Sequence, residues 1–204
     1  MAIRCVVFDI GGILEVTPST GWVERWEADL GLPSGEVDAR LEDIFAAGEL
    51  GRVTEAAVAR AVAERLALAP RQVEAFLADL WAEYLGTPNQ ELAEWFRDLR
   101  LRYRTALLSN SFVGAREKEQ EAYGYADLVD AVVYSHEVGL AKPDPEIYAL
   151  TARLTAVEPD EVLFLDDTPS AVKGAQQAGW ITVLFQDTAQ AIAELEAHLQ
   201  GTVG

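Results

Sequence analysis

The sequence predicts an α/β fold in which a doubly wound parallel β-sheet carries an inserted helical domain. Five short apolar or β-branched runs, typical of buried strands, alternate over much of the chain with segments of helical periodicity. One long interval, from about residue 22 to residue 84, has helical patterns and no strand-like run. Because strands that alternate with helices form parallel sheets covered on both faces, we interpret that interval as an insertion into such a sheet.

The elements of the sheet domain are predicted from their apolar patterns. The strands are rich in Val, Ile, Leu and Phe, and we expect them at residues 3–8, 105–108, 131–134, 162–165 and 181–185. Helices are predicted at 92–101, 147–154 and 189–199, where apolar residues recur three and four positions apart. A helix between two strands provides the long crossover connection that a parallel pair requires.

The inserted domain is predicted to span residues 17–86, which leaves residues 1–16 and 87–204 for the sheet domain. Its helical segments are rich in Ala, Leu, Glu and Arg, and Thr54 is a typical helix N-cap. Turn-forming residues flank the insertion at 17–21 and 86–89. Two such linkers are suited to act as a paired hinge.

The charge of the chain restricts the partners it can bind. Its 204 residues are 50% hydrophobic, which allows a substantial core, and its net charge is −18. A strongly negative surface repels nucleic acids and anionic membranes, so we expect neither as a partner. The sequence shows no signal peptide and no membrane-spanning run, which favours the cytoplasm. It contains no indication of an oligomeric state.

Polar side chains follow four of the predicted strands where each strand ends. Asp9 follows the first strand, Ser109 with Asn110 the second, the loop with Lys142 the third, and the pair 166–167 the fourth. Each of these groups alone is commonly a turn residue, a helix cap or a solvated loop residue. Because the carboxyl ends of parallel strands meet at one edge of a sheet, the four groups together predict a functional site there.

These segments resemble the four sequence motifs of the haloacid dehalogenase superfamily, in order and over nearly the whole chain. The matching segments are residues 8–14, 107–111, 139–148 and 164–168, the last followed by Ala171, Gly174 and Ala175. The insertion between the first and second motifs resembles the helical cap that closes over the active site in this superfamily. The resemblance therefore implies a Rossmann-like core with a cap domain.

The resemblance also implies a reaction. Asp9 would attack phosphorus and form an aspartyl-phosphate, which water then hydrolyses. Ser109 would hydrogen-bond the transferring phosphoryl group, and Lys142 would hold the nucleophile and neutralise developing charge. Ser109, Asn110 and Lys142 are the predicted substrate-binding residues. The expected substrate is a small phosphorylated metabolite, and a placed lysine and a metal would overcome the repulsion between phosphate and the negative surface.

The implied cofactor is Mg²⁺, an ion that prefers hard oxygen ligands in octahedral geometry. Its predicted protein ligands are the side chains of Asp9, Asp166 and Asp167 and the backbone carbonyl of Gly11.

One residue departs from the superfamily pattern. Most phosphatases of this superfamily have a second Asp, a general acid and base, at the place occupied here by Gly11. Glu15 is the nearest downstream carboxylate, and we expect it to be an exposed linker residue. Loss of a positioned acid slows turnover by about 10²- to 10⁴-fold unless another group replaces it.

Two alternatives remain open. The first is a 2-haloacid dehalogenase, which uses the same nucleophile without a metal and would need a cap arginine such as Arg40. The Asp166/Asp167 pair argues against it, because dehalogenases of this superfamily lack that pair. The second is a catalytically weak protein that binds a phosphorylated ligand or has a regulatory role.

Other conspicuous residues have structural interpretations. Trp22 and Trp26 lie four residues apart on one helical face, which favours a core position and also permits an aromatic wall facing the site. The charged run 117–121 is interpreted as a solvated helix face.

Overall fold

The computed structural model describes residues 2–200. The strands of the main sheet are β1 (Cys5–Phe8), β4 (Arg104–Ser109), β5 (Ala131–Tyr134), β6 (Val162–Asp166) and β7 (Ile181–Leu184). The strands β2 (Glu15–Val16) and β3 (Thr87–Pro88) form a separate pair. The helices are α1 (Trp22–Leu30), α2 (Glu36–Glu49), α3 (Glu55–Leu66), α4 (Pro70–Leu85), α5 (Gln90–Leu99), α6 (Ala115–Tyr123), α7 (Ser135–Val138), α8 (Pro145–Thr155), α9 (Pro169–Gln177) and α10 (Thr188–Gln200), with 3-10 turns at Tyr125–Leu128 and Pro159–Glu161.

The main sheet is parallel and has the order β5-β4-β1-β6-β7. The chain starts in the centre, adds strands on one side and then crosses to the other, so the sheet is doubly wound, as predicted. All five predicted strands form, within two residues of their expected ends. The central position of β1 brings its carboxyl end, and Asp9 after it, between the ends of β4 and β6.

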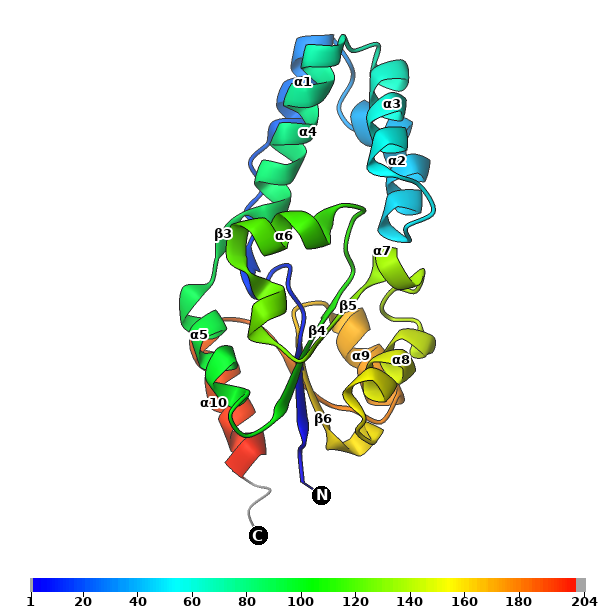
Figure 1. Cartoon of the computed structure of the whole chain (residues 1–204). Helices are drawn as coiled ribbons and strands as arrows, with labels where there is room; N and C mark the ends of the chain where they lie inside the picture. The colour runs from blue at the N-terminus through cyan, green and yellow to red at the C-terminus, as the bar shows by residue number, and fades with distance from the viewer. Residues whose placement is uncertain (1, 201–204) are drawn as a thin grey trace.

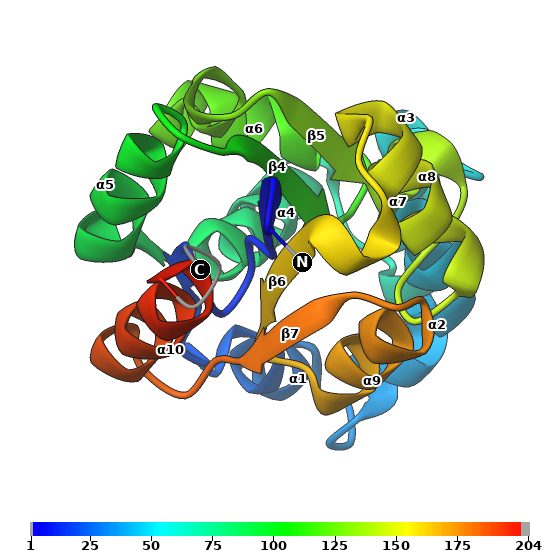
Figure 2. The same ribbon diagram turned by 90° about the horizontal axis from the view of Figure 1, so that it is seen from below.

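The two faces of the sheet are buried by different helices, as Figure 2 shows from below. Val6 and Phe8 belong to a cluster that also contains residues of α5 and α10. Cys5 and Val7, which point to the opposite face, belong to a cluster with residues of α8 and α9. All four side chains are fully buried. This burial on both sides explains why the strand is an uninterrupted apolar run rather than an alternating one.

The inserted interval forms four helices, α1 to α4, which stand above the carboxyl edge of the sheet (Figure 1). They enclose a hydrophobic cluster of their own, in which Trp22 and Trp26 pack edge-on against Phe76. Thr54 caps α3, as predicted, by accepting a hydrogen bond from the backbone N–H of Ala57. The chain therefore has the predicted helical cap, which we call the cap helices; the limits 17 and 86 stay predictions.

The linkers are more ordered than the sequence indicated. β2 and β3 form a two-stranded antiparallel ribbon in which Glu15 pairs with Pro88 and Val16 with Thr87. Strands of two residues have no hydrophobic pattern, so the sequence did not predict them. Gly86 has a positive φ of 55° and lies so close to the backbone of Val16 that a Cβ there would collide with it. The ribbon ties the entry and exit of the cap helices together.

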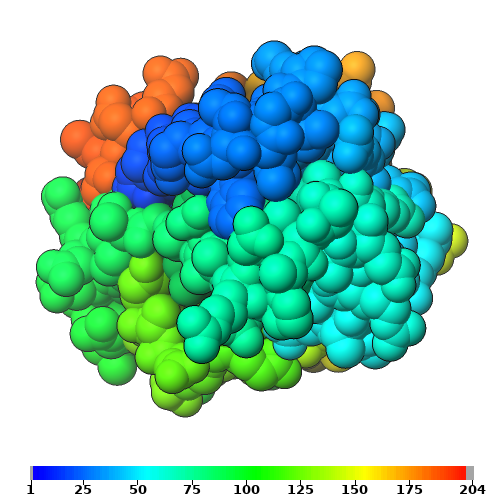
Figure 3. All heavy atoms as spheres, turned by 90° about the horizontal axis from the view of Figure 1, so that it is seen from above, coloured from blue at the N-terminus to red at the C-terminus, as the bar shows by residue number. Residues whose placement is uncertain are grey.

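The cap helices also contact the sheet domain at the end of α2. Phe112, three residues after the end of β4, belongs to the cap hydrophobic cluster. It packs where a Cβ on Gly48 would collide with its ring. The Ser135 hydroxyl donates a hydrogen bond of 2.7 Å to the carbonyl of Glu49. Seen from above, the cap helices make up much of the visible face of the molecule (Figure 3).

Between residues 2 and 200, no helix is both long enough and apolar enough to cross a bilayer.

Candidate active site

The predicted nucleophile and lysine lie together at the carboxyl edge of the sheet. The Lys142 ammonium contacts Asp9 Oδ1 at 2.9 Å and Asp166 Oδ2 at 2.6 Å. All three side chains are buried, with 8% exposure at Asp9, 7% at Lys142 and none at Asp166. Asp9 Oδ1 also accepts the backbone N–H of Ile10 at 2.8 Å. Two donors therefore fix one oxygen of the carboxylate, which orients the other.

Asn110 holds the lysine loop in place. Its amide nitrogen donates to the Lys142 carbonyl at 2.9 Å, and its carbonyl oxygen accepts the Lys142 backbone N–H at 2.7 Å. This reciprocal pair fixes the backbone from which the ammonium reaches Asp9. Asn110 also lines the pocket described below. Its side chain thus has a positioning contact that the sequence did not indicate.

Burial changes the protonation of this group. Loss of hydration raises the pKa of Asp9 to about 6, although Lys142 acts to lower it, and Asp166 raises it further. Loss of hydration also raises the pKa of Asp166, again against the opposing effect of Lys142. Burial tends to lower the pKa of Lys142, but Asp9 and then Asp166 raise it overall. Burial is therefore the main cause of the raised pKa of both carboxyls, and Lys142 offsets only part of it.

Asp167 completes a cluster of carboxylates suited to a cation. One oxygen from each of Asp9, Asp166 and Asp167 lies within 4.8 Å of the others. Asp167 is the exposed member, so the cluster opens toward solvent. Gly12 permits this arrangement, because it has a φ of 72° and a Cβ there would collide with the Asp167 carboxylate. We call Asp9, Lys142, Asp166 and Asp167 the catalytic cluster.

A pocket of about 390 Å³ lies between the cap helices and this edge of the sheet. Gly11, Ser109 and Asn110 contribute to its lining, as do residues of the cap such as Trp22 and Tyr84. This volume is within the range of about 300–1,000 Å³ typical of small-molecule sites. The structure thus brings the predicted residues Gly11, Ser109 and Asn110 to one cavity.

Glu15 corrects one expectation. It lies at the start of β2 with 1% exposure, lines the pocket and has an Oε1 atom without a hydrogen-bond partner among the described residues. The prediction of an exposed linker residue was wrong, because the linker folds back as a ribbon against the core. Burial, then Glu119 and Asp9, raise the pKa of Glu15 to about 9, so its carboxyl is neutral at physiological pH.

Glu119 corrects a second expectation. It belongs to the charged run 117–121, yet its side chain is fully buried. Its Oε2 accepts a 2.5 Å hydrogen bond from the Tyr134 hydroxyl, and its Oε1 has no partner among the described residues. Burial raises the pKa of Glu119 to about 7 against the effects of hydrogen bonds from Tyr134 and Tyr84. We call Glu15 and Glu119 the glutamate pair.

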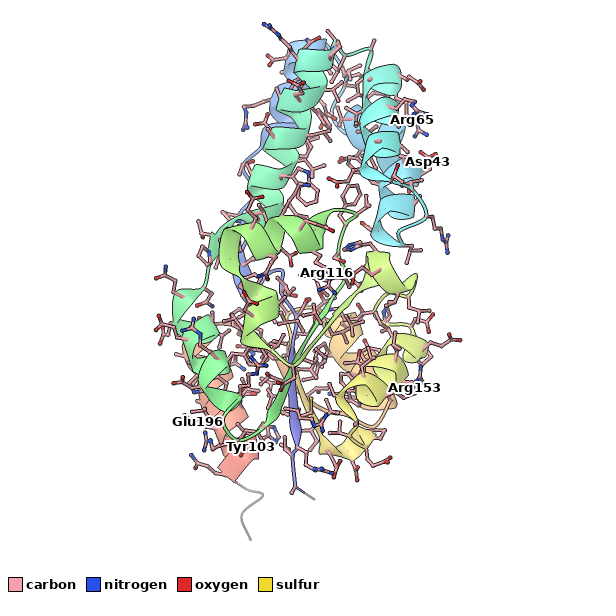
Figure 4. All side chains as sticks on the ribbon, viewed as in Figure 1. Asp43, Arg65, Tyr103, Arg116, Arg153 and Glu196 are labelled. Carbon is pink, nitrogen blue, oxygen red and sulfur yellow. The ribbon has the colours of Figure 1, made fainter. Side chains whose placement is uncertain are left out.

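Arg40, the candidate dehalogenase arginine, is engaged within the cap. Its guanidinium donates to Glu36 at 2.9 Å and to the carbonyl of Arg65 at 3.1 Å. Figure 4 labels Arg65 with Asp43 on the outer part of the cap helices, and those two residues also form an ion pair. Arg40 is not among the residues that line the pocket. Trp22, in contrast, is both a core residue and part of the pocket wall.

Comparison with known proteins decides the family. A model of haloacid dehalogenase-like hydrolases matches residues 3–179, which include every segment of the site. The chain belongs to the haloacid dehalogenase-like hydrolase family. It is therefore a hydrolase. The membership of the superfamily that the four motifs predicted is confirmed.

The relatives of this hydrolase include phosphatases and dehalogenases. Phosphatase MT3486 of Mycobacterium tuberculosis is 31% identical over 93% of this chain and 90% of its own. An (S)-2-haloacid dehalogenase of Xanthobacter autotrophicus is 33% identical over 52% of this chain and 42% of its own. The chain also matches the rat bifunctional epoxide hydrolase 2, of which it spans 39% of the length at 26% identity.

The fold is shared with solved structures. A haloacid dehalogenase family enzyme of Bacteroides thetaiotaomicron, in complex with magnesium and inorganic phosphate, superimposes with a TM-score of 0.78 at 24% identity. The match covers 93% of this chain and 99% of that one.

Proposed function

We propose that this hydrolase cleaves the phosphate monoester of a small metabolite through an aspartyl-phosphate on Asp9, with Mg²⁺ as cofactor. The catalytic cluster carries the proposal. Three carboxylates and one ammonium carry a formal net charge of −2 at this edge of the sheet, which is the charge that one divalent cation neutralises.

The donor set fits Mg²⁺, since it consists of hard oxygen atoms. Asp9, Asp166 and Asp167 would hold the ion with the Gly11 carbonyl, and Asp167 would be the ligand most open to solvent. When bound, Mg²⁺ supplies charge that draws phosphate into a negative protein and stabilises the transferring phosphoryl group. The Bacteroides thetaiotaomicron enzyme of similar fold, whose structure contains magnesium and inorganic phosphate, supports this assignment.

The residues of the chain perform the remaining steps. Lys142 and the Ile10 N–H hold Asp9 Oδ1, so we assign attack on phosphorus to Asp9 Oδ2. An oxygen–phosphorus bond to Asp9 forms as the bond to the leaving oxygen breaks, and the departing alkoxide or phenoxide then takes up a proton from water. The Ser109 hydroxyl donates a hydrogen bond to a phosphoryl oxygen. Water then attacks phosphorus, releasing inorganic phosphate and restoring Asp9.

A 2-haloacid dehalogenase is the second candidate, favoured by the dehalogenase relative and by Gly11 in place of an acid. In that reaction Asp9 would displace the halide from carbon, and no metal would be needed. The acidic pair 166–167 has no task there, and Arg40 is occupied elsewhere. The phosphatase therefore accounts for more of the site.

The test is release of phosphate from 4-nitrophenyl phosphate by the purified chain. Asp9→Asn is expected to lose activity by about 10³-fold or more, because no other group replaces the nucleophile. Asp167→Ala is expected to raise the Mg²⁺ concentration for half-maximal rate about tenfold or more, because one charged ligand is lost. Asp29→Ala, an exposed carboxylate on α1, is the matched control.

Two results would overturn the proposal. One is wild-type activity in Asp9→Asn, and the other is full activity in a chelator. Metal-free release of chloride from 2-chloropropionate, abolished in Asp9→Asn, would establish the dehalogenase instead. Tight binding of a phosphorylated ligand without turnover of any phosphate ester would establish the regulatory alternative.

A further inference from the structure

The wall of the pocket is aromatic on the side of the cap. Trp22, Phe45 and Tyr84 come from the cap helices, and Phe112 follows β4. Trp22 is held edge-on by Phe76, and Phe112 is held edge-on by Phe45 at 5.5 Å between ring centroids. These contacts fix the rings, so the cavity is preformed. Fixed rings favour a flat or ring-shaped apolar group, which gains stacking energy as well as burial.

The charged groups of the wall are all acidic. Glu49 and Glu83 line the pocket together with Glu15, whose carboxyl is neutral at physiological pH, and no lysine or arginine among residues 2–200 does so. Glu83 accepts hydrogen bonds from the backbone N–H of Thr20 at 2.5 Å and from its hydroxyl at 2.7 Å. Those bonds lower the pKa of Glu83, which keeps it ionised. Glu49 and Glu83 therefore give this pocket a wall that repels anions.

Basic side chains of the adjoining helix α6 do not reverse this field. Arg116 pairs with Glu137 at 2.5 Å and lies over the Tyr134 ring. Figure 4 labels Arg116 beneath the cap helices. Lys118 pairs with Glu55 at 2.6 Å and lies over the Trp81 ring. Both cations are thus engaged with carboxylates of the chain and do not face the pocket lining.

Glu15 adds a hydrogen-bonding group to the acidic wall. Its Oε1 atom is buried and unpartnered among the described residues, which is costly unless a ligand or water meets it. A polar group of the leaving group would meet it, because a neutral carboxyl can donate or accept a hydrogen bond, whereas a carboxylate or second phosphate would be repelled by Glu49 and Glu83.

We propose that the substrate is the phosphate monoester of an alcohol or phenol that carries an apolar ring and no second negative charge. This inference rests on the proposed phosphatase function and adds the chemical class of the leaving group. A neutral or cationic ring is accepted, and sugar bisphosphates, phosphorylated acids and other dianionic metabolites are excluded by the acidic wall rather than by size.

Three aryl phosphates of similar size test this inference. They are 4-ethylphenyl phosphate, which is neutral beyond its phosphate, O-phosphotyramine, which adds an ammonium, and 3-(4-phosphonooxyphenyl)propionate, which adds a carboxylate. Their phenols have similar pKa values of about 10, so the chemical step is alike and the remote charge differs. We expect kcat/KM with Mg²⁺ to be about tenfold or more lower for the anionic ester than for the neutral one, and highest or equal for the cationic one.

A charge-reversal variant separates the local wall from the overall charge of the chain. Glu49→Lys places a cation at the pocket, and Glu42→Lys places the same change on the same helix outside the pocket lining. Both residues are exposed, so both variants should fold. The rate ratio of anionic to neutral ester should rise several-fold in Glu49→Lys and remain near wild type in Glu42→Lys.

The same three esters are titrated into Asp9→Asn by calorimetry with Mg²⁺, which measures binding without turnover. Equal kcat/KM for the neutral and anionic esters, equal effects of the two variants, or failure of all three to bind would overturn the inference. Hydrolysis of other phosphate esters that requires Asp9 would still leave the proposed function standing. If Asp9→Asn binds the esters in the expected charge order but the wild-type protein hydrolyses no phosphate ester, the pocket inference is supported and the phosphatase function is excluded.

Discussion

Two groups of buried acids lie near each other in this hydrolase, and they carry their charge differently. In the catalytic cluster, Lys142 lies within 2.9 Å of Asp9 and 2.6 Å of Asp166. In the glutamate pair, Glu119 has a tyrosine hydroxyl at 2.5 Å, and Glu15 Oε1 has no partner among the described residues. In the first group a cation in direct contact opposes protonation of the carboxylates. The second group has no such contact among the described residues, so its carboxyls take up protons more readily.

The pKa values follow from that difference. Burial raises the pKa of Glu15 to about 9 and that of Glu119 to about 7, but the pKa of Asp9 to about 6. At neutral pH Glu15 therefore holds a proton and Glu119 is partly protonated, whereas Asp9 is mostly ionised. Burial alone does not make a site reactive; the position of one ammonium decides which acids can act as anions.

The largest expected effect comes from removing that ammonium. Lys142→Met keeps the apolar stem and leaves Asp9 and Asp166 buried without a cation. Breaking a buried ion pair on one side costs about 3–5 kcal/mol of unfolding free energy. Without the effect of Lys142, which lowers both pKa values, the two carboxylates protonate at higher pH than in wild type. Activity should also be lost.

The measurement is urea unfolding in chelator at pH 8 and pH 5. Protonated carboxyls need no cation, so the loss of stability in Lys142→Met should be smaller at pH 5 than at pH 8. Lys173→Met, an exposed lysine on α9, is the control and should change little at either pH. A destabilisation of equal size at both values would show that charge is not its cause.

The second prediction concerns the glutamate pair. Between the unfolded pKa of 4.5 and the folded pKa of about 9, the unfolded chain binds fewer protons at Glu15 than the folded chain does. Stability contributed by this residue therefore falls as pH rises through that window. Glu15→Gln removes the loss, and it should stabilise the protein by about 1–3 kcal/mol at pH 8 and by almost nothing at pH 4.

Chemical unfolding of Glu15→Gln at pH 4, 6 and 8 checks the sign. Glu94→Gln, an exposed residue on α5, provides the reference for loss of a surface charge. A variant that is destabilised progressively as pH rises would mean that Glu15 is ionised in the folded protein and has found a partner.

The sequence predicted the catalytic cluster because local rules were enough. Asp9, Lys142 and Asp166 follow or lie near the ends of strands, and parallel topology brings strand ends together whatever the details of packing. The five strands were likewise recognisable, since strands buried on both faces are continuous apolar runs.

The glutamate pair could not be predicted in the same way. Glu119 lies in a highly charged run, and its buried surroundings include Tyr84 and Tyr134, which come from two other segments of the chain. Glu15 is buried because a two-residue strand pairs across the whole insertion with β3. Tyrosines that surround a buried glutamate are brought together only by the fold, so the linear sequence does not indicate them.

The smallest expected effect lies between the two groups, at Gly11. A Cβ added there meets nothing within 4 Å, so the backbone leaves space for a side chain to begin, unlike at Gly12, where Asp167 occupies the space. We predict that wild-type rates depend steeply on leaving-group pKa, because Gly11 cannot donate a proton. Gly11→Asp should raise turnover of alkyl phosphates by about 10- to 100-fold and flatten that dependence, whereas Gly11→Asn, of the same size but without an acid, should not.

The measurement is log kcat against leaving-group pKa at fixed Mg²⁺, with trapping of phosphorylated Asp9 to show that its formation limits the rate. A flat wild-type line under those conditions would contradict the prediction and mean that an acid is already present. Glu15 is the neutral acid in the pocket lining, so a line that becomes steep in Glu15→Gln would identify it as the proton donor and would turn the glutamate pair into part of the active site.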